Sequence, residues 1–129
     1  MLKLDIVTPG RHLLTVECNE VTLPGSYGDL GILEGHTPML ATLKTGILSF
    51  KGKQNLRLMI TNGFVEVTPN CVHVLSEVAA TPAEVEEKVE RNLVKELREK
   101  LEKLETTNNK EFNRLKAEIE RSMAKLQLL

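Results

Sequence analysis

The sequence is poor in aromatic residues and carries almost no net charge. Only 3% of its 129 residues are aromatic and none is tryptophan, so the chain has little material for a surface that stacks bases or sugars. The formal net charge of −1 excludes a broad basic surface for nucleic acid or anionic lipid. We therefore expect a protein partner and no nucleic acid.

Cysteines and long apolar runs are also scarce. Cys18 and Cys71 are the only two cysteines and lack CxxC spacing, so they predict neither a zinc site nor a disulfide framework. Both are expected to be small buried side chains. No apolar run approaches the roughly 20 residues of a membrane span, and no signal peptide opens the sequence. These absences predict a soluble, intracellular protein.

Residues 1–80 are predicted to form nine or ten short β-strands. Leu2–Val7 alternates apolar and polar residues with the period of two that marks a half-buried strand. Asn62-Gly63 is typical of a two-residue turn and precedes another predicted strand, Phe64–Val67. In Cys71–Leu75, successive side chains are expected on opposite faces. Short strands at such close spacing favour a compact antiparallel sandwich or barrel.

The composition changes abruptly after Ala80. Beyond Pro82 there is no glycine and no further proline, and 22 of the last 49 residues are charged. Thr81-Pro82-Ala83-Glu84 matches a capping box with proline at the first helical position, which predicts that a helix starts there. The change divides the chain into two predicted domains, 1–80 and 81–129.

Two amphipathic helices are predicted in the second domain. Apolar residues recur every three or four positions, first at Val85, Val89, Leu93, Leu97, Leu101 and Leu104, and then at Phe112, Leu115, Ile119, Met123 and Leu126. Thr106–Asn109 separates the two stripes, and Asn108 is placed to cap the second helix. We expect an antiparallel helical hairpin with a thin core that is marginal without a second surface. The predicted fold class is therefore α+β.

The most distinctive stretch is Val21–Leu40, which reads VTLPGSYGDLGILEGHTPML. Its four glycines and two prolines punctuate short apolar pieces, as in short strands broken by tight turns. A glycine-rich crossover between two sheets would explain the same composition. The pattern PGxxGxxGILxGHxP, however, resembles the N-terminal domain of the epsilon subunit of F-type (rotary) ATP synthases. A β-rich part followed by two helices is the order of that subunit, so the resemblance extends over the whole chain.

This resemblance implies a non-catalytic rotor subunit of the central stalk. Its β-sandwich would bind the gamma subunit and rest on the membrane c-ring, and so couple proton flow to ATP synthesis. Its hairpin would lie on the sandwich or extend into the alpha/beta catalytic hexamer, where it restrains ATP hydrolysis. The expected location is the cytoplasmic face of a bacterial inner membrane, with membrane association only through the complex. Plastid-encoded members, which also lack a transit peptide, are the alternative.

The resemblance also assigns contact residues in the β-rich part. The predicted c-ring contact is a turn made of Ser26, Tyr27, Gly28 and Asp29, with aspartate where the family usually has glutamate. The predicted gamma-subunit contacts are Thr8, His36 and Ala41. Two structural alternatives stay open: the Asp29 carboxylate bonding its own turn, and the His36 imidazole bonding loop carbonyls.

Assignments on the hairpin follow from the same resemblance. Some bacterial members bind ATP through a segment Ile-Asp-x-x-Arg-Ala near the start of the first helix, but here Val89 stands in place of the arginine. We therefore expect no cofactor and no ATP on the hairpin. The predicted contacts with the catalytic hexamer, when the hairpin extends, are three basic residues on one face of the second helix: Arg114, Arg121 and Lys125. A solvated helix face is the alternative for this row.

Two other classes of function fit parts of the sequence. An enzyme would need a catalytic or metal site, but His12, His36 and His73 are not spaced as ligands on one element, and no familiar catalytic motif appears. We predict neither kind of site. A β-sandwich adaptor with a coiled-coil tail would also use the helical stripes, yet it gives no reason for the Val21–Leu40 pattern. The epsilon-type subunit is therefore the preferred interpretation.

Overall fold

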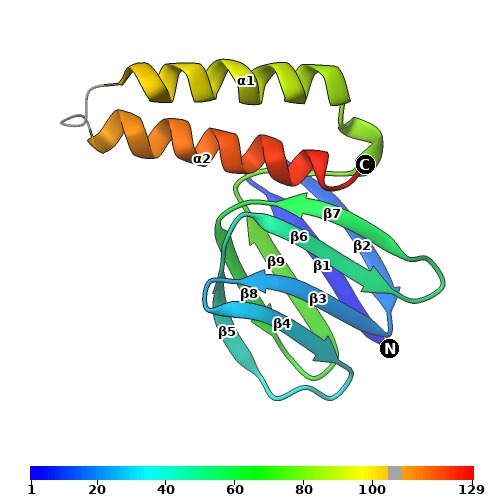
Figure 1. Ribbon diagram of the computed structural model, residues 1–129. Coiled ribbons are helices and arrows are strands. Elements are labelled where there is room, and N and C mark those ends of the chain that lie inside the picture. The colour runs from blue at the N-terminus through cyan, green and yellow to red at the C-terminus, as the bar shows by residue number, and fades with distance from the viewer. Residues whose placement is uncertain (105–108) are drawn as a thin grey trace.

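The computed structural model describes residues 1–104 and 109–129, in which ten strands precede two helices (Figure 1). The strands are β1 (Leu2–Thr8), β2 (Arg11–Cys18), β3 (Glu20–Gly25), β4 (Gly28–Leu33), β5 (Met39–Leu43), β6 (Gly46–Lys51), β7 (Leu56–Ile60), β8 (Gly63–Val67), β9 (Cys71–Ser76) and β10 (Ala79–Ala80). The helical part comprises η1 (Pro82–Glu84), α1 (Glu87–Lys103) and α2 (Asn109–Leu126). The predicted α+β class, a β-sandwich followed by two helices, is confirmed.

The strands form two facing layers. One has the order β10-β7-β6-β3-β4 and the other β5-β8-β9-β1-β2, and they join where Gly25 of β3 pairs with Leu43 of β5. Among the described strands, β1 and β9 run parallel and the other pairs are antiparallel. Alternate side chains of both layers meet in one core, which includes Leu4, Ile6, Leu23, Leu48, Leu58, Val65 and Val74. The alternation predicted for β1 and β9 is confirmed by their burial patterns.

The Asn62-Gly63 step does not close a hairpin. β7 pairs with β6 and β10, whereas β8 pairs with β5 and β9, so this step carries the chain from one layer to the other. A Cβ atom on Gly63 would lie 1.8 Å from the carbonyl oxygen of Leu75. The Asn62-Gly63 turn predicted from the sequence is therefore not the turn of a hairpin, and Gly63 itself permits a close backbone contact.

α1 begins later than the capping box predicts. The Thr81 N–H donates to the Glu84 carboxylate at 3.1 Å, but this box closes only the short 3-10 helix η1. Val85 is extended, and α1 starts at Glu87. Arg11 of β2 lies 2.9 Å from the same Glu84 carboxylate, which ties η1 to the sandwich. The predicted cap Asn108 lies outside the described residues.

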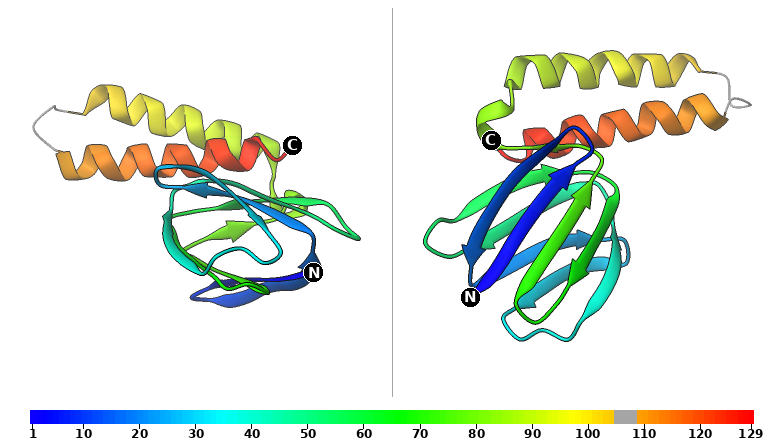
Figure 2. Two further views of the ribbon diagram at one scale, coloured as in Figure 1. Left: turned by 90° about the horizontal axis from the view of Figure 1, so that it is seen from below. Right: turned by 180° about the vertical axis from the view of Figure 1, so that it is seen from behind.

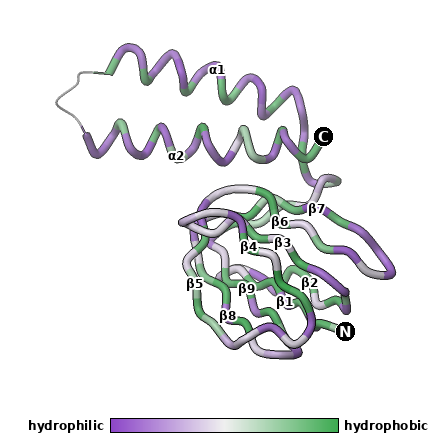
Figure 3. The backbone as a smooth tube through the Cα atoms, turned by 60° about the horizontal axis from the view of Figure 1, so that its bottom comes forward, coloured by the Kyte–Doolittle hydropathy of each residue, from purple (hydrophilic) through white to green (hydrophobic). Residues whose placement is uncertain are grey.

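The helices run antiparallel, with α2 between α1 and the sandwich (Figures 1 and 2). α2 packs on β6 and β7 as well as on α1. Both helices alternate between hydrophobic and hydrophilic residues along their length (Figure 3). Their shared core is made of Val94, Leu97, Leu115 and Ile119.

The apolar stripe predicted for α1 is correct only in its second half. Val89 and Leu93 are exposed, and Glu90 and Val94 take the inner positions instead. At about 100° per residue, each four-residue step overshoots a full turn by roughly 40°. A run of such steps therefore drifts away from the partner helix.

Candidate functional site

An apolar strip lies on the outer face of the layer β5-β8-β9-β1-β2. Phe64 of β8 pairs with Leu75 of β9, and Leu75 pairs with Val7 of β1, so these three residues lie side by side on neighbouring strands. Phe64 is 45% and Leu75 43% exposed. We call Val7, Phe64 and Leu75 the apolar strip. These three residues and Thr8 line one groove. An exposed apolar row of this kind is typical of a protein contact surface.

The predicted residues Thr8 and Ala41 lie in different environments. Thr8 borders the apolar strip, and its hydroxyl donates to the Arg11 carbonyl at 3.1 Å across the β1–β2 turn. Ala41 pairs with the buried Val65 and packs against the core. Its neighbour Leu40, which was not predicted, is 71% exposed. The strand alternation of β5 thus presents Leu40 outward where the sequence suggested Ala41.

His36 lies in the connection between β4 and β5. Its Nδ1 atom is 2.7 Å from the Thr37 carbonyl oxygen, so the imidazole bonds its own loop. The adjacent Gly35 N–H donates to the Pro69 carbonyl in the β8–β9 turn, near the start of β1. Thr8 ends β1, so His36 and Thr8 lie at opposite ends of this layer. The structure therefore does not bring the two residues together.

The predicted c-ring turn projects between β3 and β4. All four of its residues are exposed, and Tyr27 is completely so. The Ser26 N–H donates to the Thr42 carbonyl at 3.0 Å, which fixes the base of the turn, and Gly28 has a φ of +133° that only glycine adopts readily. Within the described chain, no group donates a hydrogen bond to the Asp29 carboxylate. The turn therefore offers a free negative charge.

The three predicted basic residues of α2 pair with acidic residues in three different parts of the structure: the sandwich, α1 and α2 itself. Arg121 lies 2.9 Å from Glu77 of the sandwich, and Lys125 lies 3.4 Å from Glu90 of α1. Arg114 pairs with residues of its own helix, Glu111 and Glu118. The hydrogen bond from Arg114 holds the pKa of the Glu111 carboxyl below its usual value. In the folded hairpin, none of the three cations is free.

A polar cluster that the sequence did not reveal lies on the outer face beyond the apolar strip. Asp5 of β1 bonds both the His12 imidazole and the Thr15 hydroxyl, and its second oxygen lies 3.5 Å from His73 Nδ1. The His12 hydrogen bond is the largest cause of a lowered Asp5 pKa. No three His, Cys, Asp or Glu residues of the described chain are grouped to hold a metal ion. Only the β1–β9 pairing brings His73 to Asp5, so sequence spacing alone could not reveal the cluster.

Comparison with known proteins identifies the family of this chain. A family model for the ATP synthase delta/epsilon chain β-sandwich domain matches residues 1–82. The ATP synthase epsilon chain 2 of Syntrophotalea carbinolica is 36% identical over 98% of this chain and 92% of its own length. The epsilon chain of Geotalea daltonii is 34% identical over the same shares.

A solved structure has the same fold. A chain in the cryo-EM structure of the Euglena gracilis mitochondrial ATP synthase aligns with a TM-score of 0.82 at 19% identity, over 95% of this chain and 78% of that one. In the described residues, no helix is both long and apolar enough to cross a bilayer. The sequence relatives do not favour the adaptor interpretation. The chain belongs to the ATP synthase epsilon chain family, whose members are non-catalytic subunits of that complex.

Proposed function

We propose that this epsilon-type subunit works in the central stalk by binding the gamma subunit, resting on the c-ring and restraining ATP hydrolysis through its hairpin. Family membership supports the role in an F-type ATP synthase. The observation that carries the proposal is the apolar strip, because it is an exposed contact surface on a sandwich whose core is already complete.

The gamma subunit is the proposed partner of the apolar strip. The strip borders Thr8, which the family resemblance assigns to the gamma contact, and the outward Leu40 lies on the same layer. Buried aromatic side chains carry much of the affinity of protein interfaces. Phe64 is therefore the proposed anchor, and Thr8 marks one border of the contact.

A charge at Phe64 tests this surface. Phe64→Glu is expected to weaken binding of the full chain to purified gamma subunit by at least about 30-fold, which corresponds to about 2 kcal/mol. Leu33→Glu is the matched control, since Leu33 is equally apolar and 60% exposed but lies on β4 of the other layer. Isothermal titration calorimetry measures both. An unchanged Kd for Phe64→Glu, with a native circular dichroism spectrum, would remove the strip from the interface.

The c-ring is the proposed partner of the turn Ser26–Asp29. The turn projects from the sandwich, and its Asp29 carboxylate has no partner in the described part of the chain. A free carboxylate on a fixed turn is suited to a basic loop on another protein.

The catalytic hexamer is the proposed partner of Arg114, Arg121 and Lys125 when the hairpin extends. These cations bind acidic residues in the folded hairpin, and acidic groups on the alpha/beta subunits would replace them. The proposed location is the cytoplasmic face of a bacterial inner membrane, reached only through the complex. The bacterial origin of the sequence relatives supports it.

The hairpin is proposed to act without bound ATP. Val89 replaces the arginine of the nucleotide-binding segment and is exposed. A groove between the two helices is lined by Arg91, Lys95 and Arg98, but Glu99 and Glu102 line the same groove. These carboxylates would repel the phosphates of a nucleotide. Equilibrium dialysis of the full chain against labelled ATP should therefore retain no nucleotide, and stoichiometric retention would contradict this proposal.

A further inference from the structure

The hairpin rests on the sandwich through a small contact. Its apolar part has four buried side chains, Met59, Ala80, Ala124 and Leu128, and the partly buried Ile47, Val78 and Val85 pack against them. Beside them, a guanidinium nitrogen of Arg121 lies 2.9 Å from a carboxylate oxygen of Glu77. Two of the four apolar side chains are alanines, which bury little area. The Arg121–Glu77 ion pair adds a charged contact between α2 and the sandwich beside this apolar cluster.

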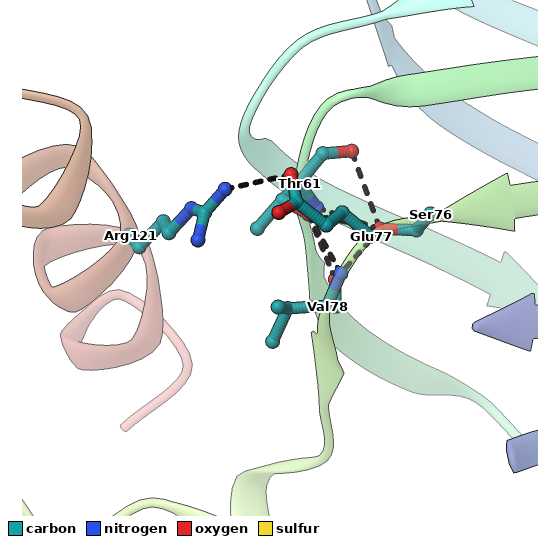
Figure 4. Close-up of polar contacts among 5 residues, drawn as sticks. All are labelled: Thr61, Ser76, Glu77, Val78 and Arg121. Carbon is teal, nitrogen blue, oxygen red and sulfur yellow. Dashed lines mark hydrogen bonds and ion pairs between the residues drawn. The ribbon is translucent and has the colours of Figure 1, made fainter. Parts of the chain in front are cut away.

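Glu77 is carried by a turn that a hydrogen-bond network holds in place (Figure 4). The Ser76 hydroxyl donates to the Val78 carbonyl at 2.6 Å and accepts from the Thr61 N–H at 2.9 Å. The Val78 N–H donates to the Thr61 hydroxyl at 2.8 Å, and the Glu77 N–H donates to the Asn62 carbonyl at 3.3 Å. Thr61 and Ser76 are buried, so water does not compete for their bonds. The turn is thus fixed before α2 docks, which lowers the entropy lost on docking.

Lys125, one helical turn beyond Arg121, is also held from outside its own helix. Its Nζ atom lies 3.4 Å from the carboxylate of Glu90 on α1. Arg114 differs, because both of its acidic partners lie on α2 itself. Moving α2 away from the sandwich and α1 would therefore free Arg121 and Lys125 but leave the pairs of Arg114 intact.

We propose that Glu77 is the counter-ion that holds the hairpin docked, and that it competes for Arg121 with acidic groups on another subunit. The competition rests on the function proposed above, whereas the docking role concerns the isolated chain alone. While the Arg121 guanidinium is paired with Glu77, it cannot pair with an acidic group of another subunit. Glu77 is thus a positioning residue that favours the docked hairpin.

Hydrogen exchange of the full chain, followed by mass spectrometry, tests the docking role. Glu77→Gln keeps the side-chain shape and removes its charge, so the amides of α2 should exchange about 2- to 5-fold faster, as expected for a partly exposed ion pair. Glu17→Gln is the matched control, since Glu17 is an exposed carboxylate on β2 away from the hairpin. Equal exchange in wild type and Glu77→Gln would overturn the role of Glu77.

A charge swap separates the ion pair from a general loss of stability. The double variant Glu77→Arg with Arg121→Glu should recover the protection of α2 relative to either single variant. Raising the salt concentration should speed exchange in wild type more than in Glu77→Gln, because screening acts on the charged pair. Failure of the swap to recover protection would contradict a direct pairing.

Inhibition of ATP hydrolysis tests the competition. A catalytic complex stripped of its epsilon subunit should be inhibited by Glu77→Gln at about 2- to 5-fold lower concentration than by wild type, because more of the variant is undocked. Faster exchange without stronger inhibition would overturn the competition and leave the docking role standing. Absence of inhibition by wild type itself would instead count against the proposed function of the hairpin.

Discussion

At the scale of single residues, the outer layer of the sandwich carries two surfaces of different chemistry. Val7 and Leu75 belong to the apolar strip, and two positions away on the same strands Asp5 and His73 face one another. Side chains two apart on a strand share a face, so both sets point outward. A partner covering this layer would meet an apolar area beside a polar one, which favours one orientation over others.

Asp5→Asn is expected to reduce the loss of stability in acid. The pKa of Asp5 is lowered in the folded chain, first by its hydrogen bond with His12. Ionised Asp5 therefore stabilises the fold fully above about pH 3.9, the unperturbed value for aspartate, and the contribution disappears as the pH falls through the lower folded pKa. Urea denaturation at about pH 7 and about pH 3 should give a smaller difference for the variant. Asp29→Asn, at a carboxylate without a described partner, should keep the wild-type difference.

Gly63→Ala is expected to destabilise the sandwich by about 2–4 kcal/mol. The new Cβ would lie 1.8 Å from the Leu75 carbonyl oxygen and 2.9 Å from its carbon, so the backbone of β8 or β9 must move. Gly10→Ala is the control, because no atom lies within 4 Å of a Cβ there. Urea denaturation measures both, and similar midpoints would show that the close approach is unimportant.

At the scale of elements, strand and helix positions were predictable and their partners were not. Period-two alternation located β1 and β9 because each strand has one buried face. Alternation does not say which strands become neighbours, so the β1–β9 pair and the crossover at Gly63 were missed. The same limit applied to the site. The Ser26–Asp29 turn could be assigned from the family resemblance of its own stretch of sequence, whereas the apolar strip requires the register of three strands.

Glu90→Leu is expected to stabilise the hairpin by about 1 kcal/mol. Glu90 is only 8% exposed, and its Oε2 atom has no hydrogen-bond partner among the described residues. A buried carboxylate with one long ion pair pays a desolvation cost that an apolar side chain avoids. Leucine there would extend the core that Val94 and Leu97 form. Hydrogen exchange of α1 should slow, whereas Glu96→Leu, at an exposed position of the same helix, should leave it unchanged.

At the scale of the whole molecule, the protein carries three candidate contact surfaces. The apolar strip lies on one layer, the Ser26–Asp29 turn projects at the β3–β4 corner, and α2 covers β6 and β7 of the other layer. The turn is separate from the other two surfaces, whereas Glu77, the partner of Arg121 on α2, also lines the groove of the apolar strip. The docked hairpin therefore adjoins the proposed gamma-subunit surface. Such an arrangement suits a rigid spacer with one movable arm.

Asp29→Arg tests the spacer role in the assembled enzyme. The substitution reverses an exposed charge on the projecting turn and leaves the core untouched, so the fold should remain intact while the contact with a basic ring loop becomes repulsive. Proton-driven ATP synthesis in reconstituted vesicles should fall severalfold, while hydrolysis by the detached catalytic part stays the same. Asp29→Glu, which restores the usual family residue, should keep the wild-type rate. An unchanged rate for Asp29→Arg would remove the turn from the interface.

The parallel pairing of β1 with β9 has a consequence for biosynthesis. β1 lies between β2 and β9, and Lys3 is paired with Cys71. During translation, β1 can therefore pair early with β2, but its pairing with β9 is possible only after most of the sandwich has been synthesised. Contacts so distant in sequence slow folding. The residues of α1 and α2 follow those of all ten strands, so the nascent hairpin meets a sandwich that is already able to close.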